Sequence, residues 1–132
     1  MAQDREKPRR RATDKLFAEW FWTDRWTNSR GHTMPMEARG LYREMLTQAW
    51  MRGAKLPNDY EQIQLVCACN PKVWRRCWPL VQPFWMVDGD WLVNATQVDV
   101  YKEAKDAQAR AQARAQAGAR AMHERRLTKV AS

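Results

Sequence analysis

The chain has 132 residues and a net charge of +8, and this length suits one domain with extended ends. No run of 18 apolar residues occurs, which excludes a membrane-spanning helix from the prediction. The charge is uneven: residues 1–15 carry +3, residues 16–101 carry none and residues 102–132 carry +5. Positive charge confined to the two ends favours a polyanionic partner such as nucleic acid. Basic ends that only keep a Trp-rich domain soluble are the alternative.

Three cysteines, an odd number, are a poor basis for a disulfide framework and favour a reducing compartment. The first residues, MAQDREKPRRRA, lack the apolar stretch of a signal peptide. We therefore expect a protein of the cytoplasm or nucleoid, without membrane association.

Residues 1–14 are strongly charged, and we expect a basic arm that is disordered when free. Arg9, Arg10 and Arg11 follow Pro8 and could lie along DNA phosphates. A short basic run of this kind is also common on protein surfaces without a binding function.

The segment Leu16–Trp26 is dense in aromatic side chains: Phe17, Trp20, Phe21, Trp22 and Trp26. The density predicts a short strand near residues 20–22, followed by a turn or short helix over residues 23–29. Burial in the core is the favoured interpretation, because large aromatics are a main source of stability in a small domain. A platform on which nucleobases stack is the alternative.

Residues 33–53 show the apolar spacing of one helix face, and this helix organises the rest of the chain. Pro35 suits its first turn and Gly53 its end. Gly40 interrupts the pattern and indicates close approach of another backbone, near Trp22 or the hairpin described below. The side chains expected to be buried are Ala38, Leu41, Tyr42, Met45, Leu46, Ala49 and Trp50.

Two shorter helices are predicted next, over residues 60–68 after a turn that ends at Asp59, and from Pro71 onward with Asn70 as N-cap. Pro79 should kink or shorten the second of them. In that helix the apolar positions are expected to face inward, and three cations remain for the surface: Lys72, Arg75 and Arg76.

Residues 84–87 and 90–93 are apolar and aromatic, and Asp88-Gly89 between them predicts a β-hairpin. Three helices closed by a hairpin form the winged-helix plan, in which the third helix reads DNA and the hairpin is the wing. We therefore expect a mostly helical α+β fold with a winged-helix-like domain over residues 15–105.

Residues 106–132 are predicted to form a basic tail rich in Ala, Arg and Gln. Nine alanines between residues 104 and 121 favour a helix, broken or frayed at Gly118. Arg110 and Arg114 share one face of that helix and could follow a DNA backbone or bind a partner. A solvated, marginally stable tail is the alternative.

We find no enzyme signature: no glycine-rich phosphate loop, no paired metal ligands and no Ser-His-Asp set. Cys67, Cys69 and Cys77 could join His32 or His123 around zinc, but C-x-C without a second pair is a weak signal. We expect no catalysis, no cofactor, no metal and no small-molecule substrate.

From Leu16 to about Lys105 the chain resembles the YdaU-like family of prophage proteins, a domain of unknown function. The resemblance rests on the aromatic opening, MPMEARGLYREMLTQAW, the LPND turn, NPKVWRRCWPLVQPFW and the DGDWLVN hairpin. It implies a winged-helix domain similar to those of phage replication initiators, and a role in replication initiation or primosome assembly. DNA is the partner implied, with a replicative helicase or helicase loader as a further one.

The sequence departs from that family after the second strand of the wing, where Asn94-Ala95-Thr96-Gln97 replaces the usual Lys or Arg. The wing tip carries Asp88 and Asp90, which should repel phosphate. DNA contact is therefore expected from Lys72, Arg75 and Arg76 and from the two ends. The alternative function is a protein adaptor that docks a helicase, a helicase loader or another replication or regulatory protein.

Overall fold

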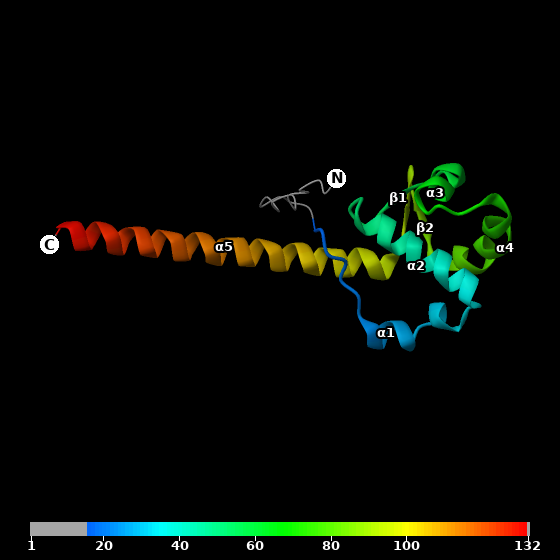
Figure 1. Ribbon diagram of the computed structural model, residues 1–132, viewed down its shortest axis with the longest axis horizontal. Helices are drawn as coiled ribbons and strands as arrows, with labels where there is room; N and C mark the ends of the chain where they lie inside the picture. Colours follow the sequence, from blue (N-terminus) through cyan, green and yellow to red (C-terminus); the bar gives the residue numbers. More distant parts are fainter. Residues whose placement is uncertain (1–15, 132) are drawn as a thin grey trace, which may run out of the picture.

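The computed structural model describes residues 16–131, and it places a small domain at one end of a long helix (Figure 1). The elements are α1 (Thr23–Thr27), a 3-10 helix η1 (Arg30–Thr33), α2 (Met36–Trp50), β1 (Leu56–Pro57), α3 (Tyr60–Val66), α4 (Pro71–Val81), a second 3-10 helix η2 (Gln82–Phe84), β2 (Met86–Asp88), β3 (Trp91–Val93) and α5 (Ala95–Ala131). The order α2, β1, α3, α4, β2, β3 is winged-helix-like, and the fold is mostly helical α+β, as predicted.

Helix α2 is the centre of the domain, and all seven of its predicted inward side chains are buried. Pro35 precedes the helix as its N-cap, and Gly53 follows it with φ +81°. Helix α4 packs against α2. The common core consists of Ala38, Leu41, Tyr42, Met45, Leu46, Ala49, Leu56, Ile63, Cys67, Trp74, Cys77, Trp78, Val81, Trp85 and Leu92.

The prediction that another backbone approaches Gly40 is wrong. Gly40 is exposed, and a Cβ built on it would meet no atom within 4 Å. The close approach occurs instead at Gly31 of η1, where a Cβ would lie 2.6 Å from Cε2 of Tyr42 and 3.1 Å from Cζ3 of Trp26. Gly31 lets the chain pass against these two rings before it enters α2.

Both predicted N-caps are confirmed. The Asp59 carboxylate accepts from the backbone N–H groups of Glu61 and Gln62, and the Asn70 side chain accepts from that of Val73. Helix α3 ends at Val66, earlier than predicted. Helix α4 continues past Pro79 to Val81 and then tightens into η2.

The three-stranded antiparallel sheet has the order β1-β3-β2. Its hairpin turn lies one residue later than predicted, because Asp88 pairs with Trp91 and leaves Gly89 and Asp90 at the turn. Gly89 has φ +60°, which suits the first position of a tight hairpin turn. Strand β1 was not predicted; it pairs Leu56 with Leu92, and both side chains are buried.

The predicted strand at residues 20–22 does not form. The prediction that the aromatic side chains of residues 16–26 are buried in the core is wrong for most of them. Phe17, Trp20, Phe21 and Trp22 are 46%, 37%, 41% and 41% exposed. Among these aromatic residues only Trp26, which belongs to α1, is partly buried against the core. The aromatic interior is supplied by other elements, chiefly Trp74 and Trp78 of α4, whose rings stack 4.7 Å apart, and Trp85.

Helix α5 is continuous over 37 residues and passes through Gly118 without a break, contrary to the prediction. Its first turns pack on the domain, where Val100 and Ala104 are buried with Trp50, and Tyr101 lies edge-on to that indole at 4.9 Å. The predicted boundary between the domain and the tail, at residues 105 and 106, falls inside this helix. All side chains of residues 113–130 are exposed, so the outer part projects from the domain (Figure 1).

Between residues 16 and 131, none of the helices combines the length and apolar character that crossing a membrane requires.

Candidate nucleic-acid interface

The three cations predicted on the third helix lie on the exposed side of α4. Lys72, Arg75 and Arg76 are all exposed, while Trp74 and Cys77 between them are buried. Helical spacing of three and four residues places the cations on neighbouring positions of one face. We call these three residues the α4 face.

One member of the α4 face is paired. The Arg76 guanidinium donates two hydrogen bonds to the carboxylate of Glu37 in the first turn of α2, one of them from Nε at 3.3 Å. The Arg76 hydrogen bond lowers the pKa of Glu37, and the same bond raises the pKa of Arg76. The positive charge of Arg76 is therefore partly offset, whereas Lys72 and Arg75 make no ion pair with any described residue.

The hairpin offers little to a polyanion. Asp88 and Asp90 are exposed at its tip. Lys55, which precedes β1, has its Nζ 4.3 Å from the centre of the Trp91 ring. The sequence-based expectation of an acidic wing tip agrees with this placement.

Arg110 and Arg114 are exposed on α5. At 100° per residue, Arg125 and Lys129 follow them on the same side of the helix, because 11 residues make close to three turns. The four cations, which we call the α5 stripe, extend over about 29 Å at a rise of 1.5 Å per residue. Sequence reasoning missed Arg125 and Lys129, although the 11-residue spacing from Arg114 to Arg125 was available.

The α4 face and the α5 stripe lie apart. Figure 1 shows α5 leaving the domain on the side opposite to α4. The third predicted cluster, Arg9, Arg10 and Arg11, lies outside the described residues.

A pocket that was not predicted from the sequence lies between the aromatic segment of residues 16–26 and the helices α2 and α5. It has a volume of about 130 Å³ and is bordered by Trp20, Phe21 and Trp22, by Tyr42 and Arg43 of α2, and by the start of α5. The Arg43 guanidinium lies 3.9 Å from the centre of the Phe21 ring, and Arg25 lies 5.7 Å from that of Trp22. Cations at these distances are attracted to the ring faces.

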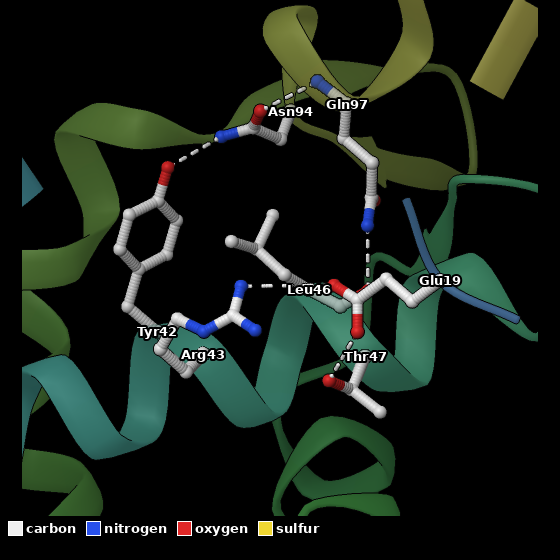
Figure 2. A network of polar contacts seen from close by, with 7 residues as sticks. All are labelled: Glu19, Tyr42, Arg43, Leu46, Thr47, Asn94 and Gln97. Carbon is white, nitrogen blue, oxygen red and sulfur yellow. Dashed lines mark hydrogen bonds and ion pairs between the residues drawn. The ribbon is translucent and has the colours of Figure 1, made fainter. Parts of the chain in front are cut away.

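A network of hydrogen bonds fixes one wall of this pocket, and Figure 2 shows the part of it that joins Tyr42, Asn94, Gln97 and Leu46. The buried side chain of Asn94 donates to the Tyr42 hydroxyl and to the Phe84 carbonyl, both at 2.9 Å, and accepts from the Gln97 backbone N–H. Gln97 Nε2 donates to the Leu46 carbonyl at 2.6 Å. Asn94 and Gln97 therefore connect α2, η2 and α5 through buried hydrogen bonds.

The opposite wall is tied to α2 by Glu19. Its carboxylate accepts from the Thr47 hydroxyl at 2.8 Å and lies 3.7 Å from Arg43 (Figure 2). The Trp50 indole also donates to the Leu16 carbonyl at 3.1 Å. These contacts hold the extended aromatic opening beside α2 while its rings stay accessible.

The cysteines and histidines form no metal centre: within residues 16–131, no three His, Cys, Asp or Glu side chains gather in an arrangement that could hold an ion. The three thiols are unbonded. Burial raises the pKa of Cys67 to about 12 and also raises those of Cys69 and Cys77. Such thiols stay protonated at neutral pH and are weak nucleophiles.

Comparison with protein-family models, with curated proteins and with solved structures finds no match to this chain, so the resemblance to the YdaU-like family stays a prediction.

Proposed function

We propose that this chain is a DNA-binding protein that contacts phosphates through the α5 stripe and the DNA groove through the α4 face. The observation that carries the proposal is the exposed, net positive outer half of α5. This outer half packs on no core, and a solvated helix of this length has little intrinsic stability. A polyanion that neutralises its cations would stabilise it.

The α4 face supports the same proposal. It belongs to the third helix of a winged-helix-like order, which is the helix that enters the major groove in that plan. In that plan the exposed side chains of Lys72 and Arg75 would contact phosphate or base edges. The acidic tip of the hairpin leaves the wing out of the proposed contact.

The resemblance noted in the sequence adds a setting to the proposal: replication initiation or primosome assembly in a phage or prophage, with a helicase or helicase loader as a further partner. In that setting the protein binds DNA and assembles other proteins on it, and it catalyses no reaction itself.

The test is the salt dependence of duplex binding by the full chain. Arg110→Ala with Arg114→Ala should weaken binding to all sequences and reduce the slope of log K against log salt by about one to two. Arg75→Ala should cost about 1–3 kcal/mol and relax sequence preference if Arg75 contacts a base. Arg52→Ala, which removes an exposed charge from the end of α2, is the matched control.

If the parent protein binds duplex DNA only weakly and without dependence on salt, the proposal is wrong. The adaptor function would then be the better one, because binding through an apolar protein surface depends little on ionic strength.

A further inference from the structure

The aromatic segment of residues 16–26 leaves large rings partly exposed, although the rest of the domain has an apolar core. Trp20, Phe21 and Trp22 are each more than a third exposed, and they border one pocket. Trp20 and Trp22 lie edge-on to each other, with ring centres 6.0 Å apart. Aromatic side chains that are held in place yet accessible are the feature on which unpaired bases stack.

The charges around the pocket favour an anionic ligand. Arg25 and Arg43 border it and are opposed by the single carboxylate of Glu19. Arg43 lies over the Phe21 ring and Arg25 beside the Trp22 ring, so each cation adjoins an aromatic face. A base on the rings would place its phosphates next to guanidinium groups.

The polar wall of the pocket holds an unused hydrogen-bond acceptor. Gln97 borders the pocket and is only 7% exposed, and its Oε1 accepts from no described residue. A buried acceptor without a donor is costly, so a partner group is expected. Each base carries an N–H on its Watson–Crick edge that could donate to this oxygen once the Gln97 side chain turns toward the pocket.

We propose that this pocket binds an unpaired nucleobase of single-stranded DNA, stacked on Trp20 or Trp22 with its phosphate beside Arg25 and Arg43. The proposal rests on the DNA-binding function proposed above and extends it to single strands. It adds a second mode of contact, since a duplex base is already stacked on its neighbours and cannot enter the pocket without being flipped out.

The experiment measures binding of the full chain to three labelled probes: a short oligothymidylate, an abasic sugar-phosphate strand of equal length and a duplex. The parent should bind the oligothymidylate more tightly than the abasic strand. Trp20→Leu and Trp22→Leu, which keep an apolar side chain but remove the ring, should each weaken oligothymidylate binding, and the more affected one by about five- to a hundredfold. Duplex and abasic binding should change little.

Trp91→Leu is the matched control, because Trp91 is also exposed, at 40%, beside a cation, but lies on β3 outside the pocket. Arg25→Gln is a second variant that leaves all the rings in place, and it should flatten the salt dependence of oligothymidylate binding. Circular dichroism confirms that each variant is folded.

Equal binding of the oligothymidylate and the abasic strand by the parent would overturn the proposal, and would be the result for an aromatic surface that docks another protein. The proposal would also be overturned if Trp91→Leu weakened oligothymidylate binding as much as Trp20→Leu or Trp22→Leu does. A third contrary result would be displacement of the strand by free thymidine monophosphate at a similar concentration. Failure of the proposed duplex function has a different signature, namely weak, salt-independent duplex binding whichever aromatic residue is changed.

Discussion

Arg76 of α4 donates two hydrogen bonds to Glu37 of α2, 39 residues earlier in the chain. More than a third of each side chain is exposed to solvent, so the pair contributes little to stability. Its effect is on charge, because Glu37 brings a carboxylate to the edge of the α4 face. The pair therefore reduces the attraction of that face for phosphate.

Replacing Glu37 by Gln should strengthen duplex binding, by up to about fivefold at low salt, because it releases Arg76 and removes a repelling charge. Binding of a labelled duplex at two salt concentrations measures the effect. Glu44→Gln removes the same charge from α2 at a position without contact to Arg76, and should change binding less. Equal effects of the two variants would show that only net charge matters.

Gly31 and Gly40 should respond oppositely to alanine. A methyl group at Gly31 meets the Tyr42 ring, which is held by Asn94 and stacked on Phe84 with ring centres 4.9 Å apart. Gly31→Ala should therefore destabilise by about 1–3 kcal/mol through overpacking. Gly40→Ala should stabilise by about 0.4–1 kcal/mol, since the site is open and helical. Urea unfolding of both variants checks the signs, and destabilisation by Gly40→Ala would contradict this account.

Asn94→Ala should lower the free energy of unfolding by about 2–4 kcal/mol. The change removes the N-terminal cap of α5 and leaves the Tyr42 hydroxyl without its donor. Asn94→Asp keeps the cap acceptor but loses the donor and places a buried carboxylate beside the Phe84 carbonyl, so it should also destabilise at neutral pH. Asn70→Ala removes an exposed cap and should cost only about 1 kcal/mol. Chemical denaturation gives all three values, and equal costs for Asn70→Ala and Asn94→Ala would contradict the buried role.

Stability should fall as pH rises above about 9. Cys67 keeps its proton in the folded protein up to a pKa of about 12, whereas the unfolded chain loses it near the ordinary value of 9.0. Between these values the folded state binds more protons, so the free energy of unfolding falls by about 1.4 kcal/mol per pH unit for this group alone. Cys67→Ala should reduce the slope measured by urea unfolding at several pH values. An unchanged slope would show that other groups, such as Tyr42, whose pKa burial also raises, carry the effect.

The parts of the fold that the sequence predicted well are those with local causes. The buried face of α2 follows from the spacing of its apolar residues, and the starts of α3 and α4 follow from the capping side chains of Asp59 and Asn70. The hairpin follows from Gly89 between two apolar runs. The predicted exposure of Lys72, Arg75 and Arg76 is also confirmed. The apolar side chains of α4 face the core, so the charged side chains on the other side of the helix face solvent.

The parts that sequence reasoning missed depend on distant partners. Strand β1 exists because Leu56 meets Leu92, and two residues carry no periodicity of their own. Composition alone could not show that other elements already fill the core and leave Trp20 and Trp22 outside. The pocket joins three segments, and the pairing of Arg76 with Glu37 crosses from one helix to another; neither has a local signal.

The opposite placement of the two basic surfaces has a consequence for stoichiometry. The α5 stripe reaches about 38 Å past Ala104, the last buried residue of α5, and it points away from α4. A molecule that uses both surfaces would therefore either contact one duplex over the whole length of the molecule or hold two DNA segments at once. If it holds two segments, the protein would cross-link DNA. A measurement of DNA compaction would then detect this function, whereas a measurement of the fraction of DNA bound would not.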